Sequence, residues 1–187
     1  MTILIIGCGY VGLPLGQLLM RRGHSVYGLR RSADADAEMV NCGITPVQAD
    51  ITDFRDLQKL SPNYDAMINL VSSSKGGVED YRQVYLEGSR NILRWLGGTK
   101  LSPGFRYLYT SSTSVYAQAD GSWVTEESPS EPDSPTSQVL IETEHELLAA
   151  RAERNFPAVI LRASGIYGPS RGHLFKQLLV FVRDHRQ

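Results

Sequence analysis

A glycine-rich segment near the N-terminus has the residue types and spacing to bind a diphosphate. Gly7, Gly9 and Gly12 form a GxGxxG pattern that directly follows an apolar run. Where such a pattern joins a strand to a helix, the first glycine permits the tight turn. The second lets the backbone approach a pyrophosphate, and the third lets helix and strand pack closely. Free amides at the helix start favour phosphate oxygens. We predict that Gly7, Gly9, Tyr10, Val11 and Gly12 bind a dinucleotide; the alternative is a plain strand-turn-helix connection.

Two arginines after the second predicted strand bear on which dinucleotide would bind. Domains that bind NAD usually place an Asp or Glu about 20 residues after the glycines, where it holds the ribose 2′-hydroxyl. This chain has Arg30 and Arg31 there, followed by Ser32. Guanidinium groups bind phosphate bidentately, so we predict NADP in preference to NAD. Asp34 and Asp36 could still reach a ribose, and a solvated arginine pair is the other interpretation.

Short apolar runs alternate with longer helical stretches, and these elements must position the residues above. We expect strands at 3–6, 25–29, 45–49, 64–71, 105–110 and 158–162. We expect helices at 11–22, 33–42, 53–60, 78–96, 136–155 and 172–183, with a long surface loop over 111–135. This alternation predicts an α/β fold, a Rossmann-type doubly wound parallel sheet of strand order 3-2-1-4-5-6. A ligand would bind at the switch between the first and fourth strands.

Composition excludes several classes of function. The chain has 187 residues with 19 Lys and Arg against 20 Asp and Glu, a net charge of -1 that gives no electrostatic case for binding nucleic acid. Its two cysteines, Cys8 and Cys42, are too few for a disulfide framework and lack the spacing of zinc ligands. The apolar N-terminus is interrupted by glycines, which argues against a signal peptide or a membrane span. We therefore expect a cytoplasmic protein that binds neither metal nor membrane.

Further segments match one family in type and order. They are Asp50-Ile51, Val71-Ser72-Ser73, Gly88-Ser89-Arg90-Asn91, Ser111 to Tyr116, and Leu161 to Pro169. As a set they resemble the extended short-chain dehydrogenase/reductase family, which includes NAD(P)-dependent sugar epimerases and dehydratases. The resemblance covers nearly the whole chain. It departs at Ala117 and Ala163, where the family motifs have a glycine and a proline.

The resemblance implies roles for some of these residues. Asp50 would bind the adenine amino group with Ile51 beside it, and the small residues Val71, Ser72 and Ser73 would line the nicotinamide ribose. In this family a serine after the fifth strand holds the oxygen of the substrate, and Ser112 occupies that position. Tyr116 is close to the site in sequence and could donate a proton, although its position in the family is usually structural.

The family's Tyr-x-x-x-Lys pair, which does the acid–base chemistry, is the main departure. Aligning the helix by Glu144 puts Thr136 at the tyrosine position and Leu140 at the lysine position. No Tyr or Lys occurs between residues 117 and 155. Three interpretations follow: catalysis by another group such as Tyr116 or His145, dinucleotide binding without turnover as a redox sensor or regulatory protein, and a scaffold that keeps only the fold.

The resemblance also concerns domains and partners. We expect residues 1–169 to form the NAD(P)-binding domain and residues 170–187 to begin a truncated or absent C-terminal substrate region. The implied partner is a small-molecule substrate such as a nucleotide sugar. Phe175, Leu178, Leu179 and Val182 fall at helical spacing, so the last predicted helix has an apolar face. That face would pack on the domain itself or form a homodimer.

Overall fold

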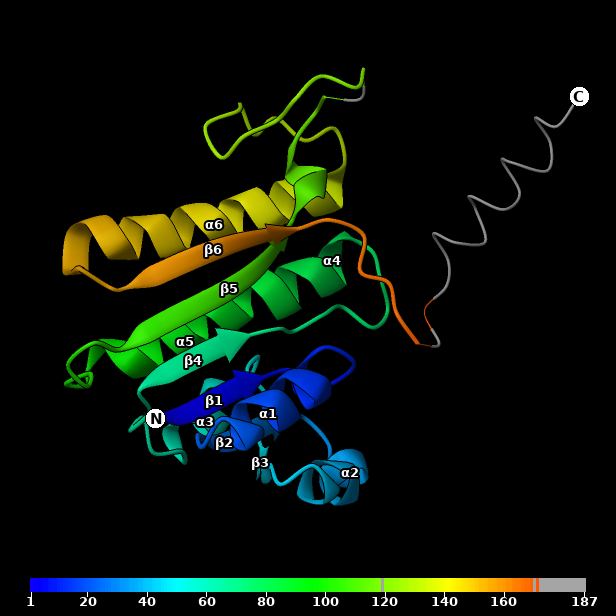
Figure 1. Ribbon diagram of the computed structural model, residues 1–187. Helices are drawn as coiled ribbons and strands as arrows, with labels where there is room; N and C mark the ends of the chain where they lie inside the picture. Colours follow the sequence, from blue (N-terminus) through cyan, green and yellow to red (C-terminus); the bar gives the residue numbers. More distant parts are fainter. Residues whose placement is uncertain (119, 170, 172–187) are drawn as a thin grey trace, which may run out of the picture.

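The apolar run near the N-terminus is the central strand of a parallel sheet in the computed structural model of the chain. The six strands are β1 (Thr2–Ile6), β2 (Ser25–Arg30), β3 (Thr45–Gln48), β4 (Ala66–Asn69), β5 (Arg106–Ser112) and β6 (Ala158–Ala163). They lie in the order β3-β2-β1-β4-β5-β6, and every pair is parallel (Figure 1). The predicted fold and strand order are confirmed.

The structure describes residues 1–118, 120–169 and 171. The predicted helix over 172–183, with the apolar face of Phe175, Leu178, Leu179 and Val182, lies outside the described residues. In the part of the chain that the structure describes, no helix is long and apolar enough to cross a membrane. The same residues contain no group of three or more His, Cys, Asp or Glu side chains that could hold a metal ion.

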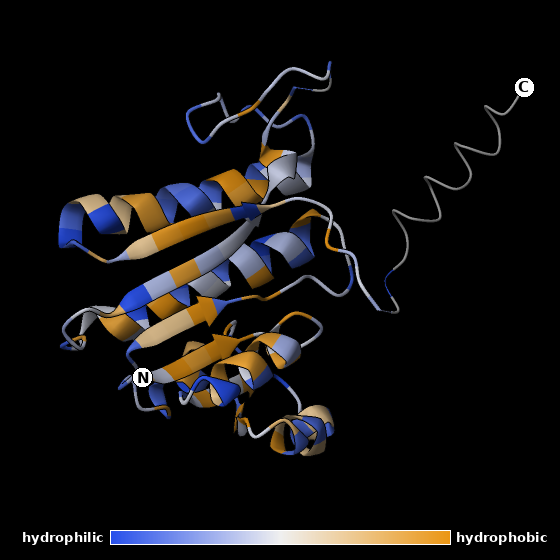
Figure 2. Cartoon of the chain, in the orientation of Figure 1, coloured by the Kyte–Doolittle hydropathy of each residue, from blue (hydrophilic) through white to orange (hydrophobic). Residues whose placement is uncertain are grey.

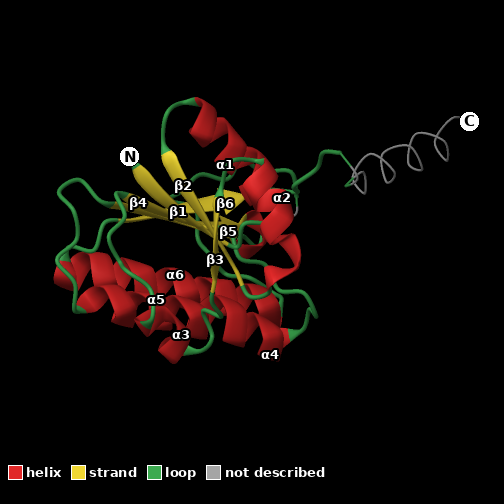
Figure 3. Ribbon diagram, turned by 90° about the horizontal axis from the view of Figure 1, so that it is seen from below, coloured by secondary structure: helices red, strands yellow, loops and turns green. Residues whose placement is uncertain are grey.

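Helices cover both faces of the sheet. The α-helices are α1 (Gly12–Arg21), α2 (Asp36–Asn41), α3 (Phe54–Gln58), α4 (Val78–Tyr81), α5 (Gly88–Gly97) and α6 (Pro135–Arg154). Seen from below, α1 and α2 lie on one side of the strands and α3 to α6 on the other (Figure 3). The first and fourth strands therefore send their chains to opposite faces, which opens a crevice between them at the carboxyl edge.

The side chains of β1 explain why this strand is central. Leu4 and Ile6 belong to the large core on the α3–α6 side, whereas Ile3 and Ile5 belong to a smaller core under α1 and α2. All four are at most 4% exposed, because alternate side chains point to opposite faces and both faces are covered. Figure 2 shows the same concentration of apolar residues along β1 and the neighbouring strands.

Two of the differences between the predicted and observed elements bear on the site. The predicted helix over 78–96 is interrupted by a π-helical segment, Arg82–Glu87, between α4 and α5. Strand β5 continues past the predicted end at residue 110, because Ser111 and Ser112 pair with Arg162 and Ala163 of β6. Both serines therefore sit on the last residues of a strand, where parallel sheets place functional side chains, and not in a surface loop.

Candidate functional site

Two adjoining pockets lie at the carboxyl edge of the sheet. We call the first the arginine pocket, because Arg30 and Arg31 line it beside Asp50 and Ile51. We call the second the serine pocket, because Ser111 and Ser112 line it after β5. The two pockets share a set of lining residues from the glycine-rich turn and the end of β4, namely Gly7, Gly9, Leu70, Val71 and Ser72. Together they can hold an elongated ligand whose middle lies on the glycine-rich turn.

The three glycines of the turn differ in what a side chain at each position would meet. Gly7 has a φ of 81°, and a Cβ there would lie 2.7 Å from the backbone nitrogen of Val71. A Cβ on Gly12 would lie 3.0 Å from Cγ2 of Ile5, so this glycine lets α1 pack against β1. A Cβ on Gly9 would meet nothing within 4 Å. The protein therefore leaves open space at Gly9, which faces both pockets.

The turn also leaves backbone donors unpaired. The amides of Gly7 and Cys8 both donate to the carbonyl of Leu29, at 3.0 and 3.2 Å. Among the described residues, no acceptor binds the amides of Tyr10 and Val11, and no side chain caps the start of α1. Unpaired amides at the positive end of a helix dipole form an anion-binding site. The residues present therefore fit a diphosphate.

The arginine pocket contains a carboxylate that is held by hydrogen bonds and two guanidinium groups that, among the described residues, are not. The Asp50 carboxylate accepts hydrogen bonds at Oδ1 from the Thr52 amide, at 2.9 Å, and from the Thr52 hydroxyl, at 2.7 Å. Arg30 and Arg31, in contrast, form no ion pair with any carboxylate in the described part of the chain. Of the two alternative ribose contacts, Asp34 accepts from Ser32 at 3.0 Å, and neither Asp34 nor Asp36 lines the pocket.

Two of the three predicted residues in the loop after β4 line the pockets, and the third does not. Val71 and Ser72 line both pockets. Ser73 lines neither, because its hydroxyl donates to Asp80 and its amide donates to the Tyr85 hydroxyl at 3.3 Å. The hydrogen bond from Ser73 lowers the pKa of Asp80. Ser73 thus anchors the loop to the helical region that follows, and Ser74 takes its place in the arginine pocket.

The serine pocket offers hydroxyl groups from the end of β5. Thr110 Oγ1 and Ser111 Oγ are buried and have no hydrogen-bond partner among the described residues. Ser112 Oγ accepts from the amide of Ser114 at 3.1 Å, and its own hydrogen is left to donate elsewhere. Unpaired buried hydroxyls at a pocket wall indicate a polar ligand, because burying such a group without a partner costs free energy.

Tyr81, Tyr85 and Leu140 also line the serine pocket, and the sequence did not single out the two tyrosines. The rings of Tyr81 and Tyr85 lie 4.9 Å apart between centroids, and burial raises the pKa of the Tyr85 phenol. Their four-residue spacing puts both rings on one helical face, and this spacing could have identified them from the sequence. Leu140 places an apolar side chain at the wall of the same pocket.

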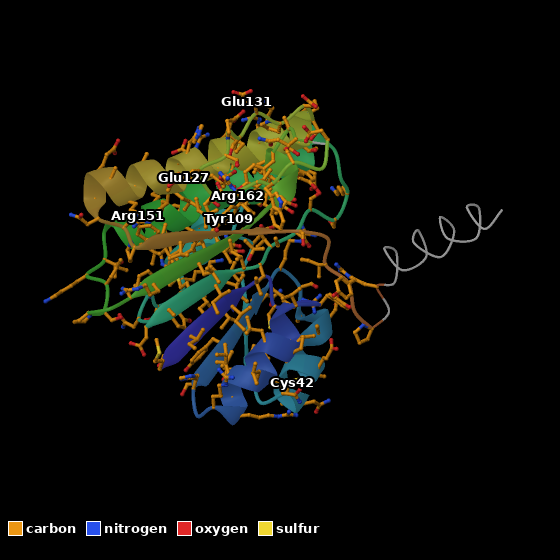
Figure 4. All side chains as sticks on the ribbon, turned by 45° about the horizontal axis from the view of Figure 1, so that its top comes forward. Cys42, Tyr109, Glu127, Glu131, Arg151 and Arg162 are labelled. Carbon is orange, nitrogen blue, oxygen red and sulfur yellow. The ribbon has the colours of Figure 1, made fainter. Side chains whose placement is uncertain are left out.

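Tyr116 lies in a different pocket from Ser112. Its hydroxyl donates to the Thr125 carbonyl at 3.0 Å and accepts from Nη1 of Arg162 at 2.8 Å. These residues line a third pocket, the edge pocket, together with Glu144 and other residues of α6 and β6. Figure 4 shows Arg162 at the α6–β6 end of the molecule, opposite the end that carries Cys42. The two predicted catalytic residues are therefore not brought together.

Comparison with known proteins identifies similar chains. The model of the NAD dependent epimerase/dehydratase family matches residues 3–182. Protein YeeZ of Escherichia coli strain K12 is 29% identical over 177 residues, which cover 90% of this chain and 60% of YeeZ. The chain thus spans about three fifths of the length of this curated relative.

Solved structures show the same relationship. A Methylobacillus flagellatus protein described as a candidate NAD-dependent epimerase/dehydratase is 33% identical, with a TM-score of 0.74 over 94% of this chain and 58% of that one. The UDP-glucuronic acid 4-epimerase of Bacillus cereus, solved with UDP-glucuronic acid and NAD, is 25% identical, with a TM-score of 0.77. That match covers 96% of this chain and 63% of the epimerase.

Proposed function

Because the chain belongs to the NAD dependent epimerase/dehydratase family, we propose that it binds an NAD(P) dinucleotide along the two adjoining pockets. We propose further that the protein uses this dinucleotide for hydride transfer on a small molecule such as a nucleotide sugar. One observation carries the proposal: the arginine and serine pockets meet at Gly7 and Gly9, where open space and unpaired amides fit a pyrophosphate.

The adenine half would occupy the arginine pocket. Gly7, Gly9, Tyr10, Val11 and Gly12 form or support the pyrophosphate site at its border with the serine pocket. Asp50 would accept from the adenine amino group through its carboxylate, with Ile51 beside the base. The unpaired guanidinium groups of Arg30 and Arg31 would bind a 2′-phosphate, and this supports NADP in preference to NAD.

The nicotinamide half would occupy the serine pocket, with Val71 and Ser72 beside its ribose. Bound NADP supplies the group that accepts or returns a hydride. The Ser112 hydroxyl, whose oxygen is fixed by the Ser114 amide, would donate to the substrate oxygen and hold it in place. A nucleotide sugar is supported as substrate class by the Bacillus cereus relative, whose structure holds UDP-glucuronic acid.

Dinucleotide binding without turnover is the second candidate function. Two placements favour it: apolar Leu140 lines the serine pocket, and the Tyr116 hydroxyl is bound to Thr125 and Arg162 away from it. On this interpretation the chain would be a redox-sensing or regulatory protein that reports which dinucleotide is bound. The serine pocket would then select the nicotinamide half without acid–base chemistry.

Calorimetric titration of the purified protein with NADPH and NADH tests the binding proposal. We expect saturable binding that is tighter for NADPH; no binding of either would overturn it. Incubation with UDP-glucuronic acid and NADP or NAD, followed by chromatography of the sugar, separates the two candidates. Conversion by wild type that is lost in Ser112→Ala supports hydride transfer, whereas intact binding with no conversion supports the second candidate.

A further inference from the structure

Tyr10 connects the glycine-rich turn to the segment that follows β6. Its hydroxyl donates to the Pro169 carbonyl at 2.9 Å. A Cβ on Gly168 would lie 2.5 Å from the same hydroxyl, so the tyrosine packs directly on the backbone there. Gly168 and Arg171 form an antiparallel bridge, with the Arg171 amide 3.0 Å from the Gly168 carbonyl and the reverse hydrogen bond at 3.3 Å. The segment is thus held over the start of α1.

Arg171 places its cationic side chain over the ring of Tyr10. The guanidinium carbon of Arg171 lies 4.2 Å from the centroid of the Tyr10 ring. Arg162 has a similar contact with Tyr116, at 4.9 Å, but its charge is paired with the Glu144 carboxylate at 2.7 Å. Arg171 has no carboxylate partner in the described part of the chain. Its charge is available to an anionic ligand.

The position of Arg171 indicates which part of a ligand it would meet. It lines the serine pocket together with Gly9, Tyr10 and Val11, and it does not line the arginine pocket. Tyr10 supplies both the unpaired amide and the ring that holds the guanidinium. An anion on that amide would therefore have Arg171 nearby, on the side away from Arg30 and Arg31.

We propose that Arg171, held against the Tyr10 ring, adds a cationic side chain to the pyrophosphate site and binds the phosphate on the nicotinamide side of the dinucleotide. This rests on the proposed function, because it places the nicotinamide half in the serine pocket. Cation–π contact with Tyr10 restricts the arginine side chain before the ligand arrives, which lowers the entropy lost on binding. The dinucleotide would then be held by arginines at two separate positions, one in each pocket.

Two half-ligands separate this site from the adenine site. Nicotinamide mononucleotide carries the proposed Arg171 phosphate, and 2′,5′-ADP carries the phosphates of the adenine half. The probes are titrated against the wild type, Arg171→Gln and Arg171→Lys, together with NADPH itself. Arg106→Gln is the matched control, because Arg106 begins β5 at the opposite edge of the sheet and donates to the Gly104 and Phe105 carbonyls. It removes the same charge without touching either pocket.

We expect Arg171→Gln to weaken nicotinamide mononucleotide and NADPH by about tenfold, the loss of one hydrogen bond to a charged group. Its affinity for 2′,5′-ADP should stay within about twofold of wild type, and Arg171→Lys should recover part of the loss because it restores the charge. If the mononucleotide is too weak to titrate, the larger loss for NADPH than for 2′,5′-ADP carries the same conclusion.

Several outcomes would overturn the proposal. Wild-type affinity of Arg171→Gln for NADPH would show that the arginine does not bind the ligand. Equal losses of affinity for both half-ligands would show that the substitution disturbs the binding site in general. A wild-type protein that binds neither dinucleotide would reject the proposed function and this site with it. If the wild type binds NADPH and Arg171→Gln binds it equally well, the proposed function stands and only this site is rejected.

Discussion

Arg162 on β6 donates hydrogen bonds to Glu144 on α6 from two guanidinium nitrogens, Nε and Nη2. Nη2 lies 2.7 Å from Oε2, and Nε lies 3.2 Å from each carboxylate oxygen. The Glu144 side chain is 1% exposed and that of Arg162 is 20% exposed. The remaining Nη1 donates to the Tyr116 hydroxyl at 2.8 Å, so the pair also fixes the loop that carries Tyr116. This arrangement is structural and holds the last strand to the last described helix.

Glu144→Ala should destabilise the protein by about 3 kcal/mol, because it leaves a largely buried guanidinium without its counter-charge. Glu142→Ala is the matched control, since it removes a carboxylate two residues away whose pair with Arg82 is solvent-exposed on both sides. That variant should cost about 1 kcal/mol or less. Urea denaturation of the two variants and the wild type gives the comparison. Equal losses would show that burial does not distinguish the pairs.

The parts of the fold that could be predicted are those where one physical requirement sets the residue type. The run Ile3 to Ile6 has no polar position because both faces of β1 are covered, and that identified a central strand. The spacing of Gly7 and Gly12 likewise followed from backbone geometry, and the structure gives each glycine a close neighbour that excludes a side chain.

Contacts across the chain could not be predicted in the same way. Ser73 has the residue type expected at a ribose, but its hydroxyl is used by Asp80 in the next helix. Tyr116 is close to Ser112 in sequence, yet its hydroxyl binds Thr125 and Arg162, and it lines the edge pocket instead of the serine pocket. Each outcome depends on which hydrogen-bond partner the folded chain brings nearest, and sequence spacing does not contain that information.

Gly9→Leu should abolish dinucleotide binding while leaving the protein folded. The added side chain meets no protein atom near its Cβ, so the free energy of unfolding should change by less than about 0.5 kcal/mol. It would instead fill the space that the pyrophosphate needs. Calorimetry with NADPH and urea denaturation measure the two effects separately.

Two other glycines provide the controls for Gly9. A Cβ on Gly98 also meets nothing within 4 Å, and Gly98→Leu should leave both binding and stability near wild type. Gly12→Leu should destabilise by about 3 kcal/mol, because Ile5 Cγ2 lies 3.0 Å from the new Cβ. Normal NADPH affinity in Gly9→Leu would contradict the placement of the pyrophosphate at this turn.

The two thiols should differ in their reaction with an alkylating reagent. Burial raises the pKa of Cys8 to about 11, so at about pH 8 roughly one thousandth of it is thiolate, the reactive form. Cys42 is only partly buried. Mass spectrometry after iodoacetamide treatment should therefore show one label on the native protein and none on Cys42→Ser.

Labelling of Cys8 should rise as the pH approaches 11, because the raised pKa delays formation of the thiolate. In urea, where burial is lost, the Cys8 thiol should react near the ordinary pKa of a cysteine. Rapid labelling of Cys8 in native Cys42→Ser at about pH 8 would mean that the glycine-rich turn opens readily to solvent.

The double variant Arg30→Ala/Arg31→Ala tests cofactor preference through charge. Both guanidinium groups line the arginine pocket without a carboxylate partner in the described part of the chain. A 2′-phosphate would give them one, and the resulting hydrogen bonds should contribute about 2 kcal/mol to NADPH binding. NADH lacks that phosphate, so its affinity should stay within about twofold of wild type.

Arg21→Ala/Arg22→Ala is the control for this variant. It removes the same two charges at the end of α1, where both side chains are exposed and neither lines a pocket that adjoins the turn. If its NADPH affinity falls as much as that of the Arg30 and Arg31 variant, the effect is long-range charge and not contact. Raising the salt concentration separates the same two causes, because screening weakens distant charges far more than a paired guanidinium and phosphate. A selective loss of NADPH that persists in high salt therefore assigns the 2′-phosphate to Arg30 and Arg31, whereas equal losses for NADPH and NADH would remove the structural basis for preferring NADP.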